Sequence, residues 1–248
     1  MIFLEKPSAP QVLSENFNDW TNDLLDAVTS YNGYSNIPRQ EKESLLRYYK
    51  HVDIKNVLFT MSSEKCVFCE GKPGENGNIE IEHFIPKSIY PEVTFDWHNL
   101  LPSCRKCNES KSTLDTTLEP IINPCEDDPE NFFEYDHLFI RPKHNLVDKT
   151  IAERTIDEVS LNSPRLFNAR ADILFNLSSY LMTVENHIKD IEESSSPRVQ
   201  RNKLNKLRSS IEVIDLLILK DKKYSAFTKN YLLKDPIYQK AKSLLLTE

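Results

Sequence analysis

The sequence is poor in glycine and has no long apolar run. Its 248 residues include four glycines, all before residue 78, and none forms the phosphate-cradling loops G-x-x-x-x-G-K-[ST] or G-x-G-x-x-G. No stretch approaches the ~20 apolar residues that cross a bilayer. The apolar start meets Glu5 and Lys6 at once and is too short for a signal peptide. The chain is therefore predicted to be cytoplasmic, without a membrane contact or a nucleotide-binding loop of its own.

The chain also lacks an excess of positive charge. Its net charge is −7 and its sequence pI is about 5.5. Proteins that grip nucleic acid over a wide surface are usually basic, because they must neutralise backbone phosphates. An acidic chain can still bind nucleic acid through a local cationic patch, or use one from a partner. Composition thus argues against an independent, high-affinity nucleic-acid binder.

The first part of the chain, residues 1–59, is predicted to be mostly helical, because apolar residues between 39 and 59 recur at helical spacings. Residues 60–115 carry most of the chemistry. Short strands are predicted there at Lys65–Glu70 and Ile79–Ile85, joined by the glycine-rich loop 71–78. A loop at Tyr90–Leu101 and a short helix at Arg105–Ser112 complete this small core.

The remainder, residues 116–248, is predicted to be an irregular hairpin followed by helices. The hairpin covers Phe132–Val147, with its turn at residues 142–145. An apolar stripe from Leu166 to Ile191 steps by three or four residues, as on one face of a long helix, and Asn162-Ser163-Pro164 offers a cap for it. Further amphipathic helices follow, which are expected to form a helical core.

Four of the five cysteines stand in two C-x-x-C pairs, Cys66/Cys69 and Cys104/Cys107. Two such pairs separated by a few tens of residues are typical of a tetrahedral structural zinc site. Zinc thiolates persist in a reducing compartment, where disulfides are rare. Cys125 has no partner at a suitable spacing and is predicted to be an ordinary buried cysteine.

Glu82-His83 lies between the two cysteine pairs, and Asn108 directly follows Cys107, the last cysteine of the second pair. Neighbouring residues of a strand point to opposite faces, so a carboxylate ligand and a base can sit side by side without bonding each other. Glu82 and the amide oxygen of Asn108 suit one hard cation such as Mg²⁺ or Mn²⁺. His83 could then take a proton from water attacking a phosphodiester, while the cation stabilises the leaving oxygen.

Glu82-His83 followed by Pro86, then Asn99-Leu100, then C-x-x-C-Asn108 leading to Lys111 resembles the HNH, or ββα-metal, nuclease family. The resemblance implies His83 as general base and Asn99 as the residue that braces the loop and orients the base. It also implies Glu82 and Asn108 as metal ligands. Many members have histidine at the third position, where this chain has Asn108, so the resemblance implies an H-N-N variant of the family. The predicted fold class is mainly α with a small ββα-metal (HNH) core stapled by a four-cysteine zinc site.

Segments outside the core extend the resemblance, among them Ile122-Asn-Pro124, Asp128-Pro129-Glu130 and the run from Thr150 to Ile156. They are similar to the nuclease subunit of the Septu anti-phage systems. That similarity implies a hetero-oligomer with an ABC-type or SMC-like ATPase, and a nucleic-acid substrate, for which DNA is favoured over RNA.

Arg105 and Lys111 are the candidate phosphate contacts of the core, although each could instead occupy a solvated helix face. The alternative function is a non-catalytic zinc-knuckle adaptor that binds nucleic acid or protein. Such an adaptor needs the cysteines but has no use for Glu82, His83 and Asn108. The sequence therefore favours a metal-dependent endonuclease.

Overall fold

A computed structural model of the chain describes residues 1–74, 77–194 and 196–246. It divides the chain into two compact units. Unit 1 comprises Met1–Phe133 and Arg141–Leu161, and unit 2 comprises Glu134–Ile140 and Asn162–Glu248. No helix in the described ranges is long and apolar enough to span a bilayer.

Unit 1 begins with helices and continues into a small sheet. Its α-helices are α1 (Gln11–Ser30), α2 (Arg39–Leu46), α3 (Val52–Met61), α4 (Arg105–Lys111) and α5 (Thr150–Glu158). Short 3-10 helices are η1 (Tyr34–Asn36), η2 (Arg47–Lys50), η3 (Pro91–Val93), η4 (Trp97–Asn99) and η5 (Pro129–Asn131). The strands β1 (Ile79–His83) and β2 (Leu100–Cys104) pair antiparallel, with Ile79 opposite Cys104 and His83 opposite Leu100.

The β1–β2 pair and α4 together form the predicted ββα core, with one correction to its strands. The segment Lys65–Glu70 is a turn rather than a strand: Glu70 has a left-handed backbone (φ 61°), and its amide donates to the carbonyl of Cys66. The second strand is instead β2, which begins inside the segment that the sequence predicts as a loop. Glu75 and Asn76 of the connecting loop lie outside the described residues.

One hydrophobic core joins the N-terminal helices to the sheet of unit 1. Leu13, Trp20, Leu24, Ile54 and Leu58 are buried together with Phe95, Trp97 and Leu100. Ile54 and Leu58 of α3 are fully buried, one helical turn apart. Helix α3 is therefore packed firmly beside the sheet.

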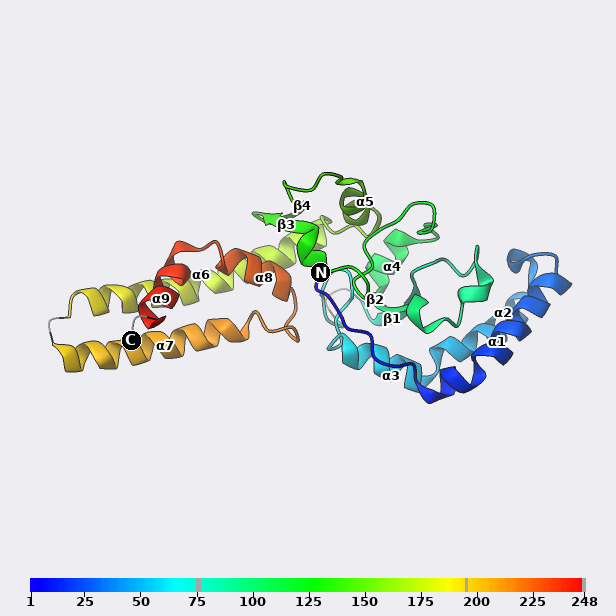
Figure 1. Cartoon of the computed structure of the whole chain (residues 1–248), viewed down its shortest axis with the longest axis horizontal. Coiled ribbons are helices and arrows are strands. Elements are labelled where there is room, and N and C mark those ends of the chain that lie inside the picture. Colours follow the sequence, from blue (N-terminus) through cyan, green and yellow to red (C-terminus); the bar gives the residue numbers. More distant parts are fainter. Residues whose placement is uncertain (75–76, 195, 247–248) are drawn as a thin grey trace. The chain divides into compact units, whose positions relative to one another are not determined.

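Unit 2 is built on long helices, as the apolar stripe predicted. Its helices are α6 (Pro164–Glu192), α7 (Pro197–Leu216), α8 (Ser225–Leu232) and α9 (Pro236–Leu246). The helices α6 and α7 lie side by side and share a buried core that includes Leu177, Leu181 and Leu207 (Figure 1). Pro164 is the first residue of α6, but the Ser163 side chain makes no capping hydrogen bond.

The predicted irregular hairpin exists, with its turn placed earlier than expected. Strands β3 (Phe133–Asp136) and β4 (Phe139–Pro142) form a second two-stranded sheet. They turn at His137-Leu138, where His137 has a left-handed backbone, rather than at residues 142–145. The Asn162 side chain, expected to help cap α6, instead exchanges two hydrogen bonds with the backbone of Ile140.

Candidate functional site

Cys66, Cys69, Cys104 and Cys107 form one buried cluster whose sulfur atoms all lie within 4.8 Å of one another. The Sγ atoms of Cys69 and Cys104 are 3.8 Å apart, far longer than the ~2.05 Å of a disulfide. A tetrahedron with metal–sulfur bonds of about 2.3 Å has sulfur–sulfur edges of about 3.8 Å. The cluster therefore has the dimensions to hold a zinc ion.

The two cysteine pairs come from a turn and from a strand–helix junction. Cys104 ends β2 and caps α4, and the amide of Cys107 donates to the Cys104 sulfur at 3.5 Å. The turn at Cys66–Cys69 is held to β2 by a bond from the Val67 amide to the Pro102 carbonyl, 2.8 Å. The cluster thus fixes the start of α4 relative to the sheet.

His83, the predicted base, is buried at the end of β1 (3% exposed). Its Nε2 lies 3.0 Å from the carbonyl oxygen of Thr94. A carbonyl can only accept, so Nε2 carries the proton and Nδ1 keeps a lone pair. Burial, assisted by the charge of nearby Lys87, holds the pKa of His83 well below its usual value, which favours the neutral base form.

The loop that presents the Thr94 carbonyl is braced by Asn99. The Asn99 amide oxygen accepts from the backbone of Ile85 at 2.6 Å. Its nitrogen donates to the carbonyls of Ile85 and Val93, both at 3.0 Å. Asn99 is buried, and these bonds tie the segments on both sides of the His83 ring. The arrangement is the one that a loop-bracing asparagine requires.

Glu82 is buried beside His83 and faces α4. Its Oε1 accepts from the Lys111 ammonium at 2.8 Å, and that ammonium also donates to the His83 carbonyl at 3.0 Å. Burial raises the pKa of Glu82, and Lys111 opposes that shift. Lys111, a candidate phosphate contact in the sequence, has a fully buried side chain. In this structure it faces the carboxylate rather than solvent.

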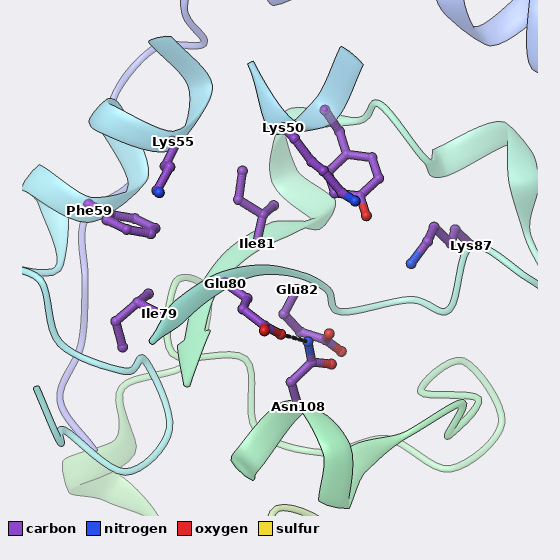
Figure 2. A pocket seen from close by; sticks show the side chains of 10 residues that line it. Lys50, Lys55, Phe59, Ile79, Glu80, Ile81, Glu82, Lys87 and Asn108 are labelled. Carbon is purple, nitrogen blue, oxygen red and sulfur yellow. Dashed lines mark hydrogen bonds between the residues drawn. The ribbon is translucent and has the colours of Figure 1, made fainter. Parts of the chain in front are cut away.

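Asn108 reaches from α4 toward the carboxylates of Glu80 and Glu82 (Figure 2). Its Nδ2 donates to Oε2 of Glu80 at 3.2 Å. Two carboxylates and an amide oxygen are hard donors of the kind that Mg²⁺ and Mn²⁺ bind. The residues present therefore fit a hard divalent cation, with Glu80 as a third donor that the sequence reasoning missed. The alternation of β1, which puts Glu80 and Glu82 on one face, was the available signal.

These donors line a pocket of about 450 Å³. Residues 79–82 of β1 and Asn108 form one side, and Lys87 also lines it. The remaining lining residues come from η2 and α3: Tyr49, Lys50, Lys55 and Phe59. Figure 2 shows Lys50, Lys55 and Phe59 across the pocket from Glu80 and Asn108.

Lys87 and Tyr49 line this pocket, and both contact the His83 ring. The Lys87 ammonium lies 3.3 Å from Nδ1 of His83, and burial lowers the pKa of Lys87. The Tyr49 ring meets the His83 ring edge-on, with centroids 4.6 Å apart, and burial raises the pKa of Tyr49 to about 12. Sequence reasoning did not single out either residue, because neither belongs to the quoted motif.

Comparisons with known proteins agree with this arrangement. The model of the HNH endonuclease family matches residues 66–114. Residues 66–114 form an HNH endonuclease domain. This domain contains the cysteine cluster, Glu82, His83, Asn99 and Asn108. The fold class expected from the sequence, mainly α with a small HNH core and four clustered cysteines, is confirmed.

The similarity extends beyond the HNH domain in some relatives. Septu protein PtuB of Bacillus thuringiensis is 36% identical over 163 residues, which cover 65% of this chain and 55% of the relative. Septu protein PtuB of Bacillus mycoides is 32% identical over 117 residues, covering 35% of this chain and 40% of the relative. Protein ea31 of Escherichia phage lambda is 39% identical over 75 residues, covering 30% and 22%. The chain is thus PtuB-like, and it spans about half the length of these PtuB proteins or less.

Proposed function

We propose that this chain is a metal-dependent endonuclease that hydrolyses phosphodiester bonds of nucleic acid, with DNA favoured over RNA. The observation that carries the proposal is the setting of His83. A backbone carbonyl fixes its tautomer, Asn99 braces the loop that supplies this carbonyl, and Glu82 lies beside it. A zinc-binding adaptor has no need for a buried histidine held in this way.

In the proposed reaction each side chain has one task. His83 accepts the proton of the attacking water at Nδ1, once the Lys87 ammonium has given up its 3.3 Å hydrogen bond to that nitrogen. The Thr94 carbonyl steadies the ring as charge develops on it. Asn99 keeps that carbonyl in place. Glu82 and Asn108, with Glu80, would hold Mg²⁺ or Mn²⁺, which supplies charge stabilisation at the leaving oxygen. Lys111 secures the Glu82 carboxylate from the side of α4.

The cleavage assay for this proposal uses plasmid DNA, linear DNA and tRNA with added Mg²⁺ or Mn²⁺. Glu82→Gln and Asn108→Ala are each expected to raise the metal concentration that gives half-maximal cleavage by roughly tenfold or more, because each removes a donor oxygen. Glu119→Gln is the matched control, since Glu119 is an exposed carboxylate outside the pocket. If the parent protein cuts no substrate with either metal, the nuclease proposal fails and the adaptor takes its place.

We further propose that the nuclease is the effector of an anti-phage defence complex, with an ABC-type or SMC-like ATPase as partner. The PtuB-like sequence supports the defence role. The absence of a nucleotide loop in the sequence leaves ATP chemistry to another chain. On α6, Phe175 and Met182 are 77% and 61% exposed and lie seven residues apart on one helix face. Large exposed apolar side chains grouped in this way are typical of a protein interface.

Co-expression with an ATPase encoded beside this chain should therefore give a stable hetero-oligomer on size-exclusion chromatography. Phe175→Glu combined with Met182→Glu should dissociate it, because two charges would enter an apolar contact. Asn176→Glu, at an exposed position of the same helix, should leave it intact. A chain that stays monomeric, cuts fully by itself and ignores the ATPase at micromolar concentration would contradict the partnership.

A further inference from the structure

The lysines available for a substrate phosphate do not lie in the HNH domain motif. Arg105, the exposed phosphate candidate of that motif, is bonded to Glu109 at 2.8 Å, and Lys111 is bonded to Glu82. Lys50 and Lys55 are exposed, and within the described ranges neither ammonium group makes a hydrogen bond or an ion pair. Their charges are therefore free to meet an anion.

Both lysines face the pocket that holds the proposed metal donors. Lys50 ends η2, Lys55 lies on α3, and each lines the pocket opposite Glu80 and Asn108 (Figure 2). Tyr49, the neighbour of Lys50, is buried in the core that includes Leu100 of β2. Ile54 and Leu58 of α3 are buried in the same core, so the backbone at both lysines is held in place. Lys55 and Phe59 follow these two helix residues by one position each, which turns them toward the neighbouring face of the helix.

Two aromatic residues of the pocket lining, Tyr49 and Phe59, lie next to its lysines. The Lys55 ammonium is 5.1 Å from the centre of the Phe59 ring. The ammonium groups of Lys50 and Lys87 are each 5.6 Å from the centre of the Tyr49 ring. Lysines interleaved with aromatic rings are the combination that binds a nucleic-acid strand, through its phosphates and its base or sugar faces.

We propose that Tyr49, Lys50, Lys55 and Phe59 form the substrate wall of this nuclease and bind the polynucleotide backbone beside the scissile phosphate. This inference rests on the proposed function, because it assigns the substrate contacts of the same pocket. The wall belongs to the N-terminal segment, outside the matched residues 66–114. Charge supports the proposal, because these residues form a cationic surface in a chain of net charge −7. Across the pocket lie Glu80 and Glu82, the carboxylates proposed to hold the metal at the scissile phosphate.

Binding is measured with the full-length, zinc-loaded His83→Asn protein, so that no cleavage occurs. The probes are a fluorescent 20-nucleotide DNA strand, its duplex and the RNA of the same sequence, titrated by anisotropy at several salt concentrations without added Mg²⁺ or Mn²⁺. Lys50→Ala with Lys55→Ala should raise Kd about tenfold or more at low salt. It should also reduce the slope of log K against log salt by about two, roughly one per phosphate contact.

Two matched controls separate charge from other causes. Lys50→Arg with Lys55→Arg keeps the charges and should keep the salt slope. Lys42→Ala removes a lysine of the same N-terminal segment outside the pocket, where its ammonium bonds the Ser35 carbonyl, and should change neither Kd nor slope. Unchanged binding by the double alanine variant, or no binding of any probe by the parent, overturns the inference.

The outcome is distinct from that of the proposed function. If the double alanine variant binds as the parent does while the wild-type chain cuts in a His83-dependent way, the nuclease stands and the substrate wall lies elsewhere. If the alanines weaken binding but the wild-type chain cuts nothing, the wall stands as a nucleic-acid site and the nuclease proposal fails.

Discussion

Replacing His83 with alanine is expected to slow phosphodiester cleavage by about 10²–10⁴-fold, the usual contribution of a general base. The expectation follows from the geometry of the imidazole. Its Nε2 is committed to the Thr94 carbonyl, and burial together with Lys87 favours the neutral form. Without that ring, the lone pair at Nδ1 is lost, and none of the residues that line the pocket is a histidine that could replace it.

Two further variants make this measurement specific to the base. His83→Asn preserves much of the buried volume beside Tyr49 and should be as inactive as the alanine variant, with its zinc content unchanged. His98→Ala changes an exposed histidine next to Asn99 and should cut at the wild-type rate. Single-turnover rates on one substrate provide the comparison. An alanine variant at position 83 that cuts within about twofold of wild type would place the chemistry elsewhere.

The parts of the fold that sequence predicted are those with short-range signals. The two C-x-x-C pairs indicate their cluster by spacing alone, since each pair turns both sulfurs toward one centre. The stripe from Leu166 to Ile191 predicts α6 because helical periodicity repeats over many turns. Glu82, His83 and Asn108 were singled out because they lie between the two cysteine pairs or directly after the second, in the order of the HNH motif.

The second strand of the core was missed because its sequence carries no strand pattern. Leu100–Cys104 is buried at every position, so it shows no alternation of apolar and polar residues. It also contains Pro102, which usually argues against a strand. Its partner β1 is distant in sequence, and the Cys66–Cys69 turn and Cys104 hold the register. Such a strand is specified by tertiary contacts rather than by local propensity.

Charge pairing across the site was equally hidden. Sequence proximity to the motif suggested Arg105 and Lys111 as phosphate contacts, but it could not show that each already has a carboxylate partner. Nor could it place Lys50 and Lys55 opposite Asn108, because that juxtaposition depends on how α3 packs on the sheet. Only the three-dimensional structure shows which charged side chains have no partner of opposite charge and can therefore bind substrate.

Replacing Cys104 with serine is expected to abolish zinc binding, to lower the melting temperature by roughly 10 °C or more, and to remove cleavage activity. Structural zinc in small peptide sites contributes about 10–16 kcal/mol at neutral pH, so losing one thiolate removes several kcal/mol. Cys104 ends β2 and caps α4. Loosening it would release Asn108 and Lys111 from their places beside Glu82, and the active arrangement would be lost with the metal.

Cys125→Ser is the matched control for this variant. Cys125 is half-buried and lies outside the four-cysteine cluster, and burial raises the pKa of its thiol to about 11. This variant should retain one zinc per chain, its melting temperature and its cleavage rate. Metal analysis and thermal unfolding of both proteins decide the matter. Thiolates bound to a metal react slowly with thiol reagents, whereas unbound thiols react readily. A wild-type chain purified without zinc, with all four cluster thiols reactive, would therefore refute the structural zinc site.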